Sequence, residues 1–318
     1  MEPSSEISAA SSSNNKNNST SMPKLKVLAF HGYRQNGSSF KGKIGSFRKT
    51  VAKYVDMTFL TGPHAVKPEE ECPNDNEDQR GWWFNAEDHS FSGKRVGGPA
   101  IGFTDTLELV EKVFKEHGPF HGLLGFSQGA CLVGMLSAMQ QKGLLPYAFD
   151  FAIMASGFCS GSLVHKSFYD ADITLPTLHI YGDTDKVIPK EMSEALVNIF
   201  VKPLVVEHRG GHYLACSGSL KGKYKDFFND MVDEGMSFHL FYELKTDSEF
   251  SQIDSILQTC SFDSAGLLRV SLDSSNPVER HGVRSHRNYK SERAYHIYLS
   301  LDYIERVYKL LSGKFTIC

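Results

Sequence analysis

Residues 121–129 read His-Gly-Leu-Leu-Gly-Phe-Ser-Gln-Gly, and this stretch decides the fold. His121–Phe126 is short, uncharged and bounded by turns, which predicts a buried strand. Ala130–Gln140 suits a helix. Between them, Gly125-Phe126-Ser127-Gln128-Gly129 fits the Gly-x-Ser-x-Gly of a nucleophile elbow, a sharp turn from strand to helix that exposes a serine hydroxyl. Both glycines are expected there, because a side chain at either position would collide across so tight a turn.

The motif by itself is a weak signal. A chain of this composition gives on the order of 0.2 such matches by chance. The alternative interpretation is an ordinary turn in which Ser127 caps the following helix. The rest of the chain has to decide between a nucleophile and a cap.

The composition is that of an ordinary globular protein. Of the 318 residues, 41% are hydrophobic and 22% are charged, with a net charge of −3. This charge gives no basis for binding nucleic acid or an anionic membrane, and no apolar run approaches the roughly 20 residues of a membrane span. The N-terminus lacks the apolar segment of a signal peptide. Six cysteines without a Cys-x-x-Cys pair predict neither a disulfide framework nor a zinc site, so a cytoplasmic location fits best.

Short apolar runs alternate with segments of helical spacing along residues 23–234. This alternation predicts an α/β fold, with a doubly wound and mostly parallel sheet covered on both faces. Residues 1–22 are rich in Ser and Asn and predict a disordered tail. The expected strands are Leu25–Phe30, Met57–Leu60, His121–Phe126, Phe149–Ala155, Thr177–Tyr181 and Leu204–Glu207, and the expected helices are 39–54, Thr104–Glu116, Ala130–Gln140, Lys190–Phe200 and Tyr224–Val232.

A glycine-bearing loop, His31–Gly37, follows the first expected strand. Ligands of open α/β sheets bind at the carboxyl ends of the strands, so a backbone amide here could face an anion. The amide of Tyr33 is the candidate, and the alternative is a plain turn. His31 has the chemistry of a base, but we expect it only to shape the loop.

The stretch from Ala65 to Gly102 is unusually long for a loop inside a compact domain. It contains both tryptophans of the chain, in Arg80-Gly81-Trp82-Trp83-Phe84, which favours packing over disorder. We expect this stretch to cover Ser127 and to supply an apolar wall. The alternative is that its aromatic side chains only fill the core.

An acid and a base for the serine lie in two later loops that follow expected strands. Asp185 lies in Gly182–Pro189, and His212 follows a double glycine in Arg209–His212. The order Ser127, Asp185, His212 is that of the α/β-hydrolases, and all three residues fall at the carboxyl edge of one parallel sheet. Competing positions remain: Asp183 or Asp185 could be turn residues that hydrogen-bond their own backbone, and His208 competes with His212.

This order predicts a mechanism. His212 takes the proton of Ser127 as the serine attacks an acyl carbonyl, and Asp185 orients and stabilises the imidazolium. The backbone amides of Gln128 and Tyr33 bind the oxyanion. Water then releases the acyl group, so neither a metal nor an organic cofactor is needed.

The motifs together resemble those of the FSH (family of serine hydrolases) esterases, which are α/β-hydrolases. The resemblance spans about residues 24–232 and rests on residues 31–37, Trp83-Phe84, 125–130, 182–189 and 211–212. It implies a fold with a minimal cap and hydrolysis of carboxylic esters with medium to long alkyl acyl chains. The roles it implies are Ser127, Asp185 and His212 for catalysis, Tyr33 and Gln128 for the oxyanion hole, and Trp83 and Phe84 for the acyl pocket.

Residues 235–318 depart from the family, whose members of this type usually end near Val232. The spacing of apolar residues over 294–311 is compatible with a helix that has one apolar face. We expect a partly disordered extension with this one helix. Alternatively, the extension packs on the hydrolase or binds a protein partner.

A serine carboxylesterase acting on a small-molecule ester is therefore the expected function. Two alternatives stay open. A thioesterase or acyl-protein hydrolase would use the same three residues, and a hydrolase fold could also bind a ligand without turning it over.

Overall fold

Six parallel strands form the central sheet in a computed structural model of the protein, which describes residues 24–67, 78–232, 261–262, 268–271 and 296–299. Their order is β2-β1-β5-β6-β7-β8. Because β1 pairs with both β2 and β5, the chain changes direction across the sheet at β1, and the carboxyl edge beside it is where such sheets bind ligands. The strands are β1 (Leu25–Phe30), β2 (Val55–Leu60), β5 (Gly122–Phe126), β6 (Phe151–Ala155), β7 (Thr177–Gly182) and β8 (Leu204–His208).

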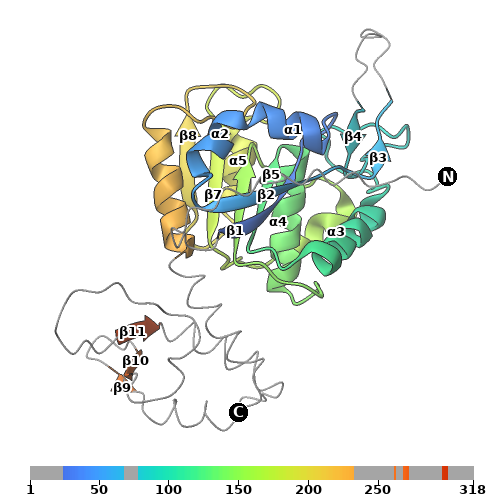
Figure 1. The fold of residues 1–318 in the computed structure, drawn as a ribbon. Coiled ribbons are helices and arrows are strands. Elements are labelled where there is room, and N and C mark those ends of the chain that lie inside the picture. Colours follow the sequence, from blue (N-terminus) through green and yellow to red (C-terminus); the bar gives the residue numbers. More distant parts are fainter. Residues whose placement is uncertain (1–23, 68–77, 233–260, 263–267, 272–295, 300–318) are drawn as a thin grey trace. The chain divides into compact units, whose positions relative to one another are not determined.

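Helices cover both faces of this sheet (Figure 1). On one face, α1 (Gly37–Lys43), α2 (Gly45–Val51) and a helix at residues 220–232 share a buried apolar cluster with the strands. On the other face, α3 (Phe103–His117), α4 (Gln128–Gln141) and α5 (Lys190–Val197) form the second cluster. The prediction of a doubly wound α/β fold is confirmed, and each expected strand from Leu25 to Glu207 has a counterpart.

Helix α4, which follows the elbow, is the central helix of its layer. Every residue from Gln128 to Met139 is buried, so the helix has no solvent face. A helix that is apolar all round belongs in the core. Its position there leaves the amino end of α4 little freedom to move.

The structure differs from the expected elements in three places. The expected helix at 39–54 is two helices, separated at Ile44, which ends α1 and begins α2. Gly42 and Gly45 flank the break, and glycine is a weak helix former. Inside the long stretch after β2, the structure forms a short antiparallel pair, β3 (His64–Ala65) and β4 (Arg80–Gly81), and a 3-10 helix, Leu163–Tyr169, follows β6.

The chain divides into two compact units, Met1–Ser237 and Phe238–Cys318. The second unit contains a three-stranded antiparallel sheet of β9 (Ser261–Phe262), β10 (Leu268–Ser271) and β11 (His296–Leu299). For the residues of β11 the expected helix over 294–311 is wrong, because their pairing with β10 overrides a short apolar pattern that fits both states. Residues 300–311 and the tail at 1–22 lie outside the described residues. Across the described ranges, none of the helices has the length and apolar character needed to span a membrane.

Candidate active site

Ser127 occupies a strained turn between β5 and α4. Its backbone has φ 53° and ψ −115°, a conformation that L residues rarely adopt. The turn is tight: a Cβ at Gly125 would lie 2.3 Å from the carbonyl oxygen of Gly129, and one at Gly129 would lie 2.3 Å from that of Phe30. Neither position can therefore hold a side chain, as the sequence predicts for both glycines.

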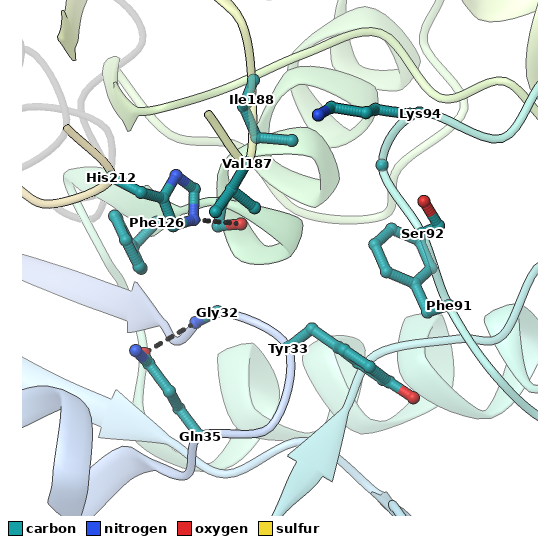
Figure 2. Close-up of a pocket in the computed structure, with 12 residues that line it drawn as sticks. Gly32, Tyr33, Gln35, Phe91, Ser92, Lys94, Phe126, Val187, Ile188 and His212 are labelled. Atoms are coloured by element: carbon teal, nitrogen blue, oxygen red, sulfur yellow. Dashed lines mark hydrogen bonds between the residues drawn. The ribbon is translucent and has the colours of Figure 1, made fainter. Parts of the chain in front are cut away.

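His212 and Asp185 converge on this serine. The Nε2 atom of His212 lies 3.0 Å from Oγ of Ser127, and its Nδ1 atom lies 2.7 Å from Oδ2 of Asp185. The first of these contacts is drawn as the dashed line from His212 in Figure 2. The ring of His212 stands 4.8 Å from that of Phe126, which precedes the serine. The three side chains thus form one hydrogen-bonded chain from hydroxyl to imidazole to carboxylate.

The carboxylate of Asp185 is buried and fully bonded. Its Oδ1 atom accepts the backbone N–H groups of Val187 and Ile188, each at 2.9 Å. Its Oδ2 atom faces the imidazole and also accepts the hydroxyl of Ser156 at 3.0 Å. A carboxylate that receives this many donors is held in one orientation.

The two loops that carry the acid and the base are tied to each other. The amide of Asp183 donates to the carbonyl of His208 at 2.9 Å, and that of Thr184 donates to the carbonyl of Gly210 at 3.2 Å. A Cβ at Gly182 would lie 2.0 Å from the Gly210 oxygen, so the two loops approach backbone to backbone. This pairing fixes the distance between Asp185 and His212.

The competing residues lie elsewhere. Asp183 is exposed, and the structure gives Asp185, not Asp183, as the partner of His212. His208 is buried against Tyr213, and neither of its ring nitrogens has a hydrogen-bond partner within the described residues. Burial lowers the pKa of His208, which keeps it neutral.

His31 shapes the loop after β1, as expected. Its Nε2 atom accepts the N–H of Gly62 at 2.8 Å, so the proton is on Nδ1, which donates to the carbonyl of Gly32 at 2.8 Å. Its own carbonyl accepts the indole N–H of Trp82 at 2.7 Å. Burial lowers the pKa of His31 to about 4, so the ring is neutral near pH 7.

Tyr33 and Gln128, the two residues expected to bind the oxyanion, belong to separate elements: the loop after β1 and the first turn of α4. Tyr33 lines the pocket beside Gly32, whose amide donates to Oε1 of Gln35 at 3.1 Å. Gln128 is the first residue of α4, and first-turn amides have no acceptor within their own helix. Tyr33 thus lines the same cavity as Ser127, and Gln128 follows Ser127 directly in the chain.

The side chain of Gln128 has a structural task that the sequence did not indicate. Its Oε1 atom accepts the amide N–H of Trp82 at 3.0 Å, and its Nε2 atom donates to the carbonyl of Trp83 at 2.7 Å. The side chain is buried. It therefore ties the elbow to the stretch after β4.

A cavity of about 390 Å³ opens at Ser127 and His212. Figure 2 shows Phe91 and Tyr33 across the cavity from His212, with Val187 beside His212 and Ile188 above Val187. Phe91 to Lys94 come from the long stretch between β2 and α3, so that stretch does supply a wall. The lining residues are Gly32, Tyr33, Gln35, Phe91, Ser92, Gly93, Lys94, Phe126, Ser127, Val187, Ile188 and His212.

The structure does not place Trp83 and Phe84 in the lining of this cavity, contrary to the role that the resemblance implies for them. Both are buried. Trp83 packs edge-on behind Phe91, with ring centroids 5.2 Å apart, and Phe84 stacks on His89 at 5.3 Å. Trp83 belongs to the buried apolar cluster that contains residues of α3 and α4, and the partly buried Phe91 packs against this cluster and lines the cavity.

Sequence reasoning missed Ser156 and the wall residues Phe91, Val187 and Ile188. Ser156 follows a strand at the same edge as the other site residues, and that position was the available signal. Val187 and Ile188 belong to the Asp185 loop and carry no chemical signal of their own. Within the described ranges, no group of three or more His, Cys, Asp or Glu side chains could hold a metal ion.

Comparison with known proteins gives a consistent result. Residues 20–221 match the family described as serine hydrolase (FSH1). Esterase CG5412 of Drosophila melanogaster is 45% identical over 253 residues, which cover 80% of this chain and 90% of that protein. Esterase OVCA2 of Danio rerio is 43% identical over 217 residues, which cover 64% of this chain and 96% of that protein.

Proposed function

This chain belongs to the serine hydrolase (FSH1) family and is a carboxylic ester hydrolase, and from that premise we propose that Ser127, His212 and Asp185 are its catalytic triad. The observation that carries the proposal is the position of His212, within 3.0 Å of the hydroxyl and 2.7 Å of the carboxylate. A serine hydroxyl needs a neighbouring base that a third group orients, and this imidazole has both partners.

The proton path follows from these contacts. Nδ1 of His212 donates to Asp185, which leaves Nε2 as the acceptor for the Ser127 proton during attack on the ester carbonyl. The imidazolium then gives that proton to the leaving alcohol, and an acyl-enzyme remains. Water, deprotonated by the same nitrogen, attacks the acyl-enzyme and restores the free serine.

The oxyanion of each tetrahedral intermediate would be held by the backbone amides of Gln128 and Tyr33. Gln128 adds the positive end of the α4 dipole, because it is the first residue of that helix. Loss of one such donor typically costs roughly 3–4 kcal/mol of transition-state stabilisation. The assignment is supported by the place of Gln128 directly after Ser127 and by Tyr33 lining the same cavity as Ser127.

The acyl group of the substrate is expected to be an alkyl chain of medium to long length. Phe91, Val187 and Ile188 contribute apolar side chains to the lining of the cavity that holds Ser127 and His212. Burial of each methylene against such a wall contributes about 0.8 kcal/mol. A thioester of the same acyl group would meet the same triad and wall, and it remains the alternative substrate.

Turnover of a series of alkyl esters by the full chain tests the proposal. Ser127→Ala should abolish hydrolysis and labelling by a fluorophosphonate while the thermal midpoint stays close to that of the wild type. Ser137→Ala is the matched control, since Ser137 is a buried serine of α4, the helix that follows Ser127. Among the described contacts its hydroxyl bonds only the Val133 carbonyl.

Two outcomes would contradict the proposal. Persistent turnover by Ser127→Ala would exclude Ser127 as the nucleophile. An unlabelled Ser127 in a wild-type protein that binds an ester without cleaving it would favour the non-catalytic alternative. Rates on matched oxoesters and thioesters then separate the two enzymatic alternatives.

A further inference from the structure

Ser156 is a second serine at the carboxyl edge of the sheet, one residue beyond β6. It is fully buried, and its hydroxyl donates to Oδ2 of Asp185 at 3.0 Å. The same oxygen faces Nδ1 of His212 at 2.7 Å. The Ser156 hydroxyl therefore bonds the oxygen of Asp185 that also bonds His212.

The backbone of Ser156 is in a costly conformation. Its φ is 48°, in the left-handed region that glycine occupies more easily than any residue with a side chain. The amide is fixed by a 2.8 Å bond to the carbonyl of Ile180 on β7, and the preceding carbonyl, of Ala155, accepts the amide of Ser127 at 2.9 Å. Strained residues of this kind collect at functional sites, where the surrounding structure holds them. Here the conformation aims a hydroxyl at Asp185.

The other donors to Asp185 cannot replace this hydroxyl. The amides of Val187 and Ile188 both bond Oδ1. On the oxygen that faces the imidazole, Ser156 is the one donor besides His212 among the described contacts. Without this hydroxyl, one hydrogen bond that stabilises the negative charge on Oδ2 would be lost. The carboxylate would then be free to rotate about its contacts through Oδ1.

We propose that Ser156 is a positioning residue of the triad, which holds Oδ2 of Asp185 in line with Nδ1 of His212 and shares that oxygen with the imidazole. The proposal rests on the triad assigned above. Removal of the donor should strengthen the attraction between Asp185 and the imidazolium. The acidic limb of the kcat/KM profile would then move to higher pH.

Two other titratable groups lie near the carboxylate of Asp185, and neither accounts for a shift of the acidic limb of the kcat/KM profile. His208 lies close to Asp183, Asp185 and Glu207, but burial outweighs their effect and lowers its pKa, which favours the neutral ring. Asp183 is exposed, so solvent screens its charge. A shift of the limb in a Ser156 variant therefore reports on the Asp185 and His212 pair.

Two substitutions in the full chain test the proposal. Ser156→Ala removes the hydroxyl, and Ser156→Gly removes the hydroxyl and also relieves the backbone strain. Both should lower kcat on an alkyl ester by about 10-fold, the scale of one hydrogen bond to a charged group, with KM nearly unchanged. Both should also move the acidic limb upward. Ser137→Ala, the buried helical serine used above, should leave the limb where it is.

Active-site titration with a fluorophosphonate gives the number of competent sites in each variant. The positioning role is overturned if both Ser156 variants keep the wild-type kcat and limb. It is also overturned if kcat falls only in proportion to the number of titrated sites while the acidic limb of the kcat/KM profile does not move. That result would mean that the variant contains less folded protein and that each folded site works normally. If Ser156→Ala does not fold, Ser156→Gly gives the same measurement. A wild-type chain that neither hydrolyses esters nor reacts at Ser127 would instead refute the triad itself.

Discussion

Gln128 receives the backbone N–H of Trp82 on its side-chain oxygen at 3.0 Å, so the residue after the elbow serine also anchors the stretch that leads to the cavity wall. The side-chain Nε2 atom of Gln128 donates to the carbonyl of Trp83 at 2.7 Å. Gln128→Ala leaves a buried donor and a buried acceptor unpaired and opens a small cavity. We expect the free energy of unfolding to fall by about 2–4 kcal/mol and kcat by at least about 10-fold, measured by urea denaturation and ester turnover.

Gln140 provides the matched control at the other end of α4. Its side chain makes the same two-bond contact with the backbone of Phe149, donating to the carbonyl and accepting the amide, both at 2.9 Å. Gln140→Ala should lose stability while kcat on folded enzyme is unchanged. Equal losses of kcat in the two variants would mean that the Gln128 contact contributes only to folding.

Gly93 and Ile188 set the width of the cavity. A Cβ at Gly93 would lie 2.6 Å from Cδ1 of Ile188 and 3.1 Å from Cζ of Phe158. Gly93→Ala therefore pushes the Ile188 side chain into the space proposed for the acyl chain. The ratio of kcat/KM for a long-chain ester to that for an acetyl ester should fall about 10-fold, the scale of one methylene in a tight apolar site.

The double variant Gly93→Ala with Ile188→Val distinguishes this effect from general damage. Valine lacks the Cδ1 atom, so the pair should recover most of the lost ratio. In a double-mutant cycle the two changes would then be strongly non-additive. If the effects of the two substitutions on this kcat/KM ratio are additive, or if neither changes the ratio, the acyl chain does not pass between Gly93 and Ile188.

Buried histidines make the stability of the fold depend on pH. Burial lowers the pKa of His31 to about 4 and that of His179 to about 3, against about 6.5 in an unfolded chain. The unfolded state thus binds more protons, and the free energy of unfolding decreases as the pH falls from about 6.5 toward these values. Each residue should contribute a loss of about 2 kcal/mol between pH 7 and pH 5, measured by urea denaturation at both pH values.

His179→Leu should reduce that pH-dependent loss by about 2 kcal/mol. His179 is remote from the triad, and its ring packs against Phe200, with centroids 5.0 Å apart. Phe200→Leu is the control: it weakens the same packing without removing a titratable group, so it should lower stability equally at both pH values. An unchanged pH dependence in His179→Leu would exclude His179 as a source of the acid sensitivity.

Much of the fold could be predicted because the pattern is local. Leu25–Phe30 is a strand with the expected bounds, since a short buried run between turns has few other stable states. The break at Ile44 and the pairing of β11 were not predictable in this way. In both places the apolar spacing fits more than one structure, and neighbouring segments decide between them.

Part of the candidate site also followed from the sequence. Ser127, Asp185 and His212 each come after a strand, and parallel strands end at one edge, so chain order alone indicated that they meet. Trp83 shows the limit of that reasoning. The family resemblance implied that Trp83 borders the acyl pocket, yet in the fold it is buried and packs against Phe91. The volume available in the core determines which ring reaches the cavity, and the sequence does not show that volume.

The sequence by itself determined the strands, the two glycines of the elbow and the order of serine, acid and base, because these depend on local periodicity and on the shared edge of a parallel sheet. Only the tertiary structure decided that Ser156 bonds Asp185 and that Gln128 holds Trp82. Those contacts join residues 29 and 46 positions apart, and their existence depends on the registry of strands and the approach of loops, which no local pattern contains.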